Sequence, residues 1–368
     1  MIYLAWRNLA QSKTHFLLGV GGVALALLLM LALDALLTGS EDDLTAYIIQ
    51  SGADVFVAQD GVQNMHMAAS AITWRDLRLA SHAEGVASAS PILYTTTVVD
   101  TGRGDVLSYI IGFDPAEPLG GPRRLQAGTT ELREKETLID AAVARSRKLQ
   151  LGDTIKIFGE EFTIVGLTQG LTNIINSVTF IRLEDFADLR GDTAISYALL
   201  KVQPGANPAE VAAAINARND NVTALSQATF AREERQIIKD MSVEVLNLMN
   251  AAGLLIGLAV TGLTLYTGVL SKRREYGVLK AIGAKNSHLY AVVGAQTVLS
   301  MGLGLGFALG LIWGLGLVLP WLVPGVNLAL AWPSVLRVLL ATLLIGVISA
   351  LVPARQMARL NPAQVFRG

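Results

Sequence analysis

The sequence contains no cysteine among its 368 residues, which excludes a disulfide framework. Charged residues are also scarce, at 16%, whereas 52% of the residues are hydrophobic, a balance too apolar for an ordinary soluble protein. The motifs GxxxxGK[ST], HExxH, CxxC and GxSxG are all missing, and the four histidines are scattered. The chain therefore cannot hold ATP on a phosphate loop, and we expect no catalytic residues, no metal and no cofactor bound by the chain itself.

Four apolar runs are long enough to cross a bilayer, which takes about 20 residues in a helix. They cover residues 16–37, 246–270, 289–319 and 335–352. Residues 38–245 form a polar region large enough for a folded domain with its own core. The sequence thus predicts a membrane α-helical protein with four transmembrane helices and an α+β domain inserted between helices 1 and 2.

Charge is distributed unevenly along the chain. Residues 38–245 hold 28 acidic residues against 18 Lys and Arg, a net charge of −10. Segments 1–15, 271–288 and 353–368 together carry ten Lys and Arg and one acid, Glu275, while the loop 320–334 has no Lys or Arg. The positive-inside rule predicts that both termini are cytoplasmic and that residues 38–245 are extracytoplasmic. A cleaved signal peptide is the alternative for the first run, but that run exceeds the usual apolar core of such peptides.

Period-two patterns and turn residues predict the elements of the inserted domain. Strands are expected at 53–59, 87–101, 107–112, 154–158, 161–165, 177–181 and 197–202, and helices at 73–81, 141–149 and 208–218. The segment GDTIKIFGEEFTIVG is typical of a hairpin that turns at Gly159. The loop DPAEPLGGPRR, residues 114–124, is expected to divide two subdomains because it is rich in Pro and Gly.

The segments that enter and leave this domain have helical periodicity as well. A helix that runs unbroken over 230–270 would be about 60 Å long, and Leu37, Leu44 and Ile48 indicate a similar extension of the first span. We interpret the two as stalks; a hinge between span and domain is the alternative. Glycines at helical spacing in two spans allow close helix packing. Packing within one chain is our first expectation, and packing between two copies stays open as the alternative. These glycines are Gly253, Gly257, Gly302, Gly306, Gly310 and Gly314.

The loop between the second and third spans reads SKRREYGVLKAIGAKNSHLY. It predicts a short basic, amphipathic helix, with Tyr276, Leu279 and Ile282 near one face and Gly283 as its C-terminal cap. A simple orientation signal would also account for the positive charge, so charge alone does not assign a function to this loop.

Five segments of the chain resemble one family. KRREYGVLKAIGA, PARQMARLNPAQVFR near the C-terminus and AWRNLAQSKTHF near the N-terminus are similar to the membrane domain of FtsX-like permeases, which include MacB-type and lipoprotein-releasing ABC transporter subunits. TLIDAAVARSRKLQLGDTIKIFGEEFTIVGL resembles the MacB periplasmic core domain. The segment GADVFVAQDG is most similar to the branch that contains DevC and the haem-export type.

This resemblance implies a permease in the inner membrane of a prokaryote. Two permease copies, expected as a homodimer, would assemble with two ATPase subunits that bind ATP and magnesium. A periplasmic adaptor or an outer-membrane channel is a further partner that the resemblance allows; membrane lipids surround the spans, and nucleic acid is not expected. The exported or extracted substrate would be lipophilic or amphipathic, and the alternative is a signalling permease that activates an extracytoplasmic peptidoglycan hydrolase without transport.

The resemblance also assigns coupling to the ATPase to the basic loop. The expected coupling residues are Lys272, Arg273, Arg274, Glu275, Tyr276, Gly277, Leu279, Lys280, Ile282, Gly283 and Lys285. Two further places are candidate substrate contacts. Met65, His66 and Met67 could ligate haem iron or a soft metal, although Met often fills gaps in a core. Asp34 is an acid near the outer end of the first span, where intramembrane acids are often functional.

Overall fold

The computed structural model describes residues 13–358 except 118, 174–175, 192–193 and 324. The predicted N-terminal amphipathic helix (1–15) and C-terminal tail (353–368) lie in part outside the described residues. The chain divides into two compact units. The membrane unit comprises the described parts of Met1–Thr38, Ser242–Val318 and Leu328–Gly368, and the head unit comprises Gly39–Met241 and Leu319–Asn327.

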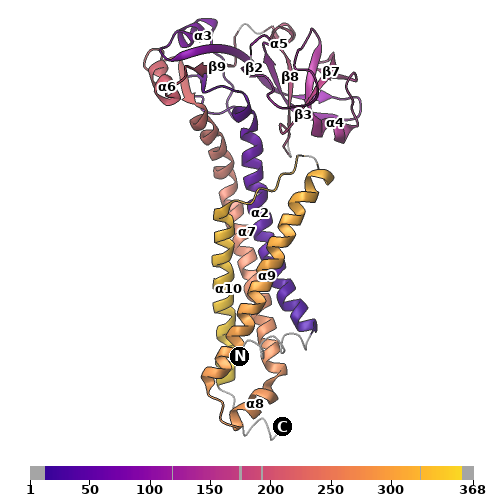
Figure 1. The fold of residues 1–368 in the computed structure, drawn as a ribbon, viewed down its shortest axis with the longest axis vertical. Helices are drawn as coiled ribbons and strands as arrows, with labels where there is room; N and C mark the ends of the chain where they lie inside the picture. Colours follow the sequence, from indigo (N-terminus) through magenta and orange to yellow (C-terminus); the bar gives the residue numbers. More distant parts are fainter. Residues whose placement is uncertain (1–12, 118, 174–175, 192–193, 324, 359–368) are drawn as a thin grey trace. The chain divides into compact units, whose positions relative to one another are not determined.

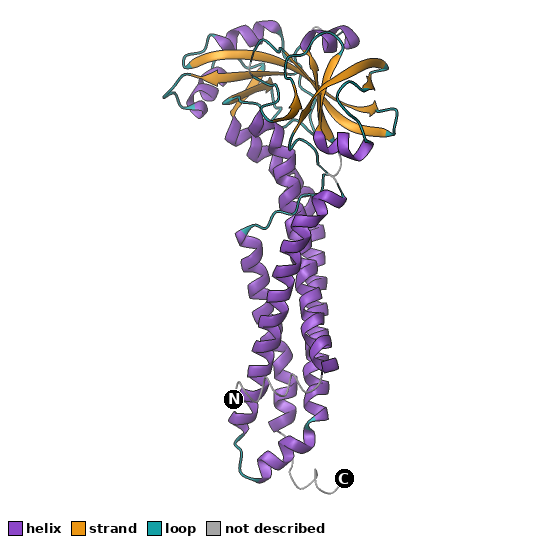
Figure 2. Cartoon of the chain, turned by 45° about the vertical axis from the view of Figure 1, so that its right-hand side comes forward, coloured by secondary structure: helices purple, strands orange, loops and turns teal. Residues whose placement is uncertain are grey.

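Within the described residues, four helices are long and apolar enough to cross a membrane, and each contains one predicted span. They are α2 (Lys13–Gln50), α7 (Gln227–Ser271), α9 (Asn286–Leu322) and α10 (Trp332–Ala358), and the short helix α8 (Arg273–Ala281) follows α7 (Figures 1 and 2). The predicted helix over 230–270 is confirmed, because α7 has no break. The extension of the first span is confirmed too, because α2 continues to Gln50.

Glycines allow the helices of the membrane unit to approach one another. A Cβ atom at Gly253 would lie 2.7 Å from Met30 on α2, and one at Gly257 would lie 2.7 Å from Ile345 on α10. These two glycines therefore pack within the chain, as predicted. A Cβ atom at Gly304 would lie 2.5 Å from Val23, so Gly304 is the glycine by which α9 approaches α2.

The intrachain role predicted for the other glycines of α9 is wrong. A Cβ atom placed at any of them would have no neighbour within 4 Å among the described residues. The reason is that they lie on a different side of α9 from Gly304, which is buried against α2. The four positions, which we call the glycine stripe, are Gly302, Gly306, Gly310 and Gly314.

The head unit is built on a ten-stranded mixed sheet, with the order β10-β1-β9-β2-β3-β8-β5-β7-β4 and with β6 paired to β2 and β7. Strands β3 and β8 are parallel, as are β5 and β7. The strands are β1 (Val55–Gln59), β2 (Val86–Asp100), β3 (Asp105–Phe113), β4 (Leu125–Gly128), β5 (Glu136–Asp140), β6 (Thr154–Ile157), β7 (Glu160–Thr168), β8 (Ser177–Arg182), β9 (Tyr197–Val202) and β10 (Val222–Ser226). The helices are α3 (Trp74–Ser81), α4 (Ala141–Arg147), α5 (Leu183–Arg190) and α6 (Pro208–Asn216).

Strand β2 joins the two halves of this sheet. Its first part, Val86–Ile92, pairs with β9, and its second part, Leu93–Asp100, pairs with β3. The expectation that the loop 114–124 divides two subdomains is therefore wrong. The loop follows β3 inside one half, and the chain returns to the other half only at β9.

Local sequence signals account for several of these elements. Strands β6 and β7 form the predicted hairpin, with Phe158 (φ 53°) and Gly159 (φ 87°) at the turn; two positive φ values give the turn type that matches the twist of the strands. Helix α6 begins as predicted, because the Asn207 side chain accepts a hydrogen bond from the Ala209 N–H and Pro208 occupies the first turn.

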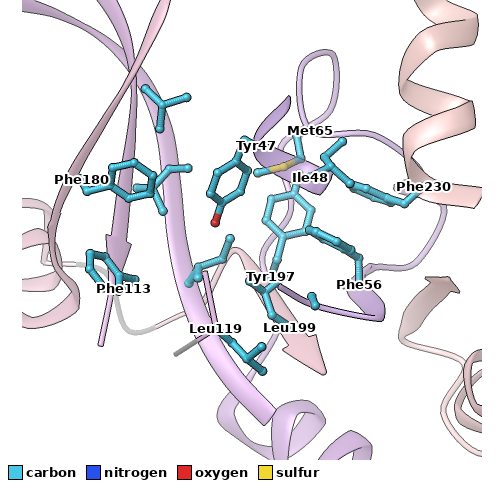
Figure 3. Packing of buried hydrophobic residues seen from close by; sticks show 14 of the residues in the cluster. Tyr47, Ile48, Phe56, Met65, Phe113, Leu119, Phe180, Tyr197, Leu199 and Phe230 are labelled. Atoms are coloured by element: carbon cyan, nitrogen blue, oxygen red, sulfur yellow. The ribbon is translucent and has the colours of Figure 1, made fainter. Parts of the chain in front are cut away.

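Three hydrophobic clusters pack the head unit. The first cluster joins the sheet to the two long helices: Tyr47 and Ile48 come from α2, Phe230 comes from α7, and Phe56 and Tyr197 come from strands (Figure 3). The Phe56 and Phe230 rings stack with centroids 4.7 Å apart and planes 5° from parallel. The head ends of α2 and α7 are thus part of the core of the head unit.

Candidate functional site

The basic helix α8 has a defined start and end. Helix α7 stops at Ser271, Lys272 has non-helical angles (φ −103°, ψ 15°), and α8 begins at Arg273. At the other end Gly283 has φ +98°, and the Ala284 N–H donates to the carbonyl of Leu279 at 2.9 Å. A positive φ suits glycine because it has no Cβ, so Gly283 ends the helix as the sequence predicted.

Tyr276 anchors α8 in the membrane unit. Its side chain is 3% exposed and packs in a cluster with Val269, Leu289, Val292 and Val293. Burial, followed by the nearby Glu275 carboxylate, raises the pKa of the Tyr276 hydroxyl, although a hydrogen bond with Gln296 opposes the shift. Gly277 is buried beside it.

The predicted common face of Tyr276, Leu279 and Ile282 is wrong. Leu279 is 41% exposed and Ile282 is 77% exposed, because three-residue steps on a helix drift around its axis. Val278 is exposed too, as are the charged side chains of Arg273, Arg274 and Glu275. α8 thus presents exposed apolar residues and two arginines, a set that we call the docking surface: Arg273, Arg274, Val278, Leu279 and Ile282.

A second cluster, which the sequence did not predict, joins α7 to the segment that contains Met65. The Glu234 carboxylate is 2% exposed. One of its oxygens accepts a hydrogen bond from the Met65 N–H at 2.7 Å, and the other forms an ion pair with Nδ1 of His66. The His66 ring also meets the Tyr109 ring edge-on at 4.6 Å. We call Met65, His66 and Glu234 the clamp, because they fasten the Met65 segment to α7.

The three residues considered as haem or soft-metal ligands have different surroundings. Met65 is part of the hydrophobic core, His66 is paired with Glu234, and Met67 is exposed. A small cavity beside His66 has a volume of only about 20 Å³, which is room for about one water molecule. A porphyrin does not fit there. Burial raises the pKa of Tyr109, which also lines this cavity, to about 12.

Asp34 has a partner within the membrane unit. Its side chain is 4% exposed, and its carboxylate lies 3.1 Å from the guanidinium of Arg337 on α10. Arg337 also donates to the hydroxyl of Ser334 at 3.3 Å. Both charged residues lie near the outer ends of their predicted spans, which is the one signal in the sequence that could have paired them. This pair ties α2 to α10.

Two family models match this chain. The model described as MacB-like periplasmic core domain matches residues 16–218, and the model described as FtsX-like permease C-terminal matches residues 247–362. The chain belongs to the MacB-like and FtsX-like permease family. It is an ABC transporter permease of that type, and its head unit corresponds to the extracytoplasmic α+β domain, as the sequence predicted. The four apolar helices and this domain fit an inner-membrane protein.

Relatives of the permease cover the chain end to end. It is similar to an uncharacterised ABC transporter permease of Methanocaldococcus jannaschii, with 23% identity over 100% of this chain and 98% of the relative. It is also similar to the macrolide export ATP-binding/permease protein MacB of Hyphomonas neptunium, with 23% identity over 98% of this chain and 59% of that protein. The periplasmic region of MacB from Actinobacillus actinomycetemcomitans aligns with a TM-score of 0.39 and 11% identity, over 50% of this chain and 94% of that one.

Proposed function

We propose that this permease couples ATP hydrolysis by a separate ATPase subunit to motion of its extracytoplasmic head unit, and that it exports or extracts a lipophilic or amphipathic substrate. The docking surface of α8 is the observation that carries the proposal. Tyr276 fixes α8 to the helices of the membrane unit, while Leu279 and Ile282 are left exposed. An apolar patch flanked by arginines is typical of a surface that binds a protein partner.

Helix α7 supplies the connection between the two units. It has 45 residues, which corresponds to about 68 Å at about 1.5 Å per residue. Its residues up to Met241 belong to the head unit, and the rest belong to the membrane unit. Glu234 and Phe230 hold the head end through the clamp and the ring stack. A push on α8, which follows α7 after one non-helical residue, would therefore reach residues in the core of the head unit.

The charge pattern and the relatives support the rest of the proposal. The basic character of α8 supports a position on the cytoplasmic side under the positive-inside rule, where an ATPase has access to ATP. The Hyphomonas relative is named for both ATP binding and permease, and this chain covers 59% of it. Because the present sequence has no phosphate loop, the ATPase would be a separate subunit. The glycine stripe, which is open in the described chain, supports assembly of two permease copies.

The test is the stimulation of the partner ATPase by the permease in proteoliposomes. The double variant Leu279→Glu/Ile282→Glu should insert and fold normally, because exposed substitutions usually change stability by less than about 0.5 kcal/mol, but it should abolish the stimulation. The matched control is Leu151→Glu, at an exposed leucine of the head unit, which should leave stimulation unchanged. Full stimulation by the double variant would contradict the proposal.

A further inference from the structure

The head unit contains a cleft that is separate from the clamp and from α8. Its outer lobe has a volume of about 620 Å³ and its inner lobe about 220 Å³. Both lobes are lined by Gln126, Arg145, Gln169 and Pro320, so they are adjacent to each other. Pockets of about 300–1,000 Å³ accommodate small organic ligands. The cleft is therefore large enough for the headgroup and the first part of the chain of an amphiphile.

One wall of the cleft is polar and carries an available positive charge. Arg145 lies on α4, between Gln126 on β4 and Gln169 after β7. Among the residues that the structure describes, no carboxylate or other side-chain acceptor pairs with the guanidinium of Arg145. The nearest acid in sequence, Asp140, is committed elsewhere: its two oxygens accept hydrogen bonds from the N–H groups of Ala142 and Leu171, each at 2.8 Å. The charge of Arg145 is thus left for a ligand.

The outer lobe is also lined by apolar residues that come from the end of a membrane span. Pro320, Trp321 and Leu322 form the last turn of α9, the third of the helices able to cross a membrane. Trp321 is 85% exposed, and Leu322 is exposed as well. Tryptophan at the end of a span is typical of the interface between the hydrocarbon and the headgroups. A ligand in the outer lobe would therefore meet side chains of the kind that contact lipid at this interface.

We infer that this cleft binds an amphiphile with an anionic headgroup, such as a phospholipid, with the phosphate on Arg145 and the apolar part on Trp321 and Leu322. Guanidinium groups bind phosphate through charge-assisted hydrogen bonds, and the amides of Gln126 and Gln169 add donors beside it. The inner lobe is lined by Asp43 and Asp140, whose carboxylates repel a second anionic group. A role of this cleft in transport rests on the proposed function. The cleft then identifies the chemical class of the substrate.

The absence of native cysteine allows a single fluorescent reporter in the full-length chain. Ser146 lines the outer lobe, so a bimane label on Ser146→Cys reports occupancy in detergent. We expect a saturable change on titration with dihexanoyl phosphatidylglycerol and a weaker response to dihexanoyl phosphatidylcholine. Adding Arg145→Gln should weaken the binding of phosphatidylglycerol by about tenfold or more, as expected for loss of a charged hydrogen-bond donor. Trp321→Ala should weaken it through loss of apolar contact.

The matched control is Lys148→Gln, which removes one positive charge at the end of the same helix from a residue that lines neither lobe. It should bind phosphatidylglycerol like the parent. Equal binding by the Arg145→Gln variant, or no saturable response, would overturn the inference. Inorganic phosphate that competes as well as the lipid would overturn it too, because the apolar residues would then contribute nothing. Stimulation of the partner ATPase separates the two proposals. If the permease binds phosphatidylglycerol but does not stimulate the ATPase, the proposed function is wrong. If it stimulates the ATPase but does not bind the lipid, the lipid site is wrong.

Discussion

Replacing Glu234 by alanine should release the Met65 segment from α7. The carboxylate is buried and serves two partners, the Met65 N–H at 2.7 Å and the His66 ring. Removing one member of a buried charged pair costs about 3–5 kcal/mol. The His66 side chain is 15% exposed, so the pair is not fully shielded from water, and we expect a cost near the lower end, about 3 kcal/mol, most of it from the orphaned Met65 N–H and the lost pairing.

Hydrogen–deuterium exchange on the intact permease in detergent measures this cost at the site. If the segment opens locally, about 3 kcal/mol corresponds to an increase of about 100-fold in the exchange rate of the Met65 amide, since about 1.4 kcal/mol is a factor of ten. The Glu234→Gln variant keeps the shape of the side chain and one hydrogen-bond acceptor but loses the charge. The exchange rate of the Met65 amide should therefore increase less, by about tenfold.

The adjacent Glu233 provides the control. No hydrogen bond or ion pair involves its side chain among the residues that the structure describes, and Glu233→Gln should leave exchange unchanged. If Glu234→Ala exchanged at the same rate as Glu233→Gln, the carboxylate would not hold the segment, and the clamp would have no energetic basis.

Two further predictions concern the head unit and the assembly. Burial opposes ionisation of Asp76, but hydrogen bonds from Thr73 and Asn219 outweigh the effect of burial and lower the pKa of the Asp76 carboxyl. The ionised carboxylate therefore stabilises the folded state fully above the unfolded pKa of about 3.8. This stabilisation is lost as the pH falls through the lower folded pKa. Asp76→Asn should destabilise the head unit by about 1–2 kcal/mol at pH 7 and by much less in strong acid, measured by urea unfolding; an equal loss at both pH values would contradict this. The Gly306→Cys variant should form disulfide-linked dimers in membranes under mild oxidation, because the glycine stripe is open. The control Leu25→Cys, at an exposed position on α2, should not form such dimers. Equal cross-linking of the two variants would contradict assembly through the glycine stripe.

Periodicity and turn chemistry were sufficient to predict most of the fold. The long helices, the β6–β7 hairpin, the start of α6 and seven of the strands follow from apolar runs, alternation and capping residues. Strands β4, β5 and β10 were missed; each has only four or five residues, and none has the other signals of the equally short β1 and β6, namely the apolar run of β1 and the hairpin turn after β6. Helix α5 was missed as well; its N-terminus has no side-chain cap.

The candidate sites were predicted less completely, because they depend on tertiary contacts. Arg232, Glu233, Glu234 and Arg235 form one charged run, and nothing local marks Glu234 as the buried member. Asp34 was recognised as a candidate, but its pairing with Arg337 depends on how α2 and α10 pack. The face of α8 was misjudged because Tyr276 packs on residues far along the chain, such as Leu289 and Val293.

The connection between β10 and α7 has a consequence for evolution of this protein. The strand ends at Ser226 and the helix begins at Gln227, so no linker separates them, and β10 is held along its whole length by five residue pairs with β1. A displacement of the first turn of α7 is therefore transmitted directly to the edge strand β10. An insertion of the kind that surface loops tolerate would create a flexible linker between β10 and α7 and weaken the coupling between them. Natural selection should therefore keep any linker at this position from appearing.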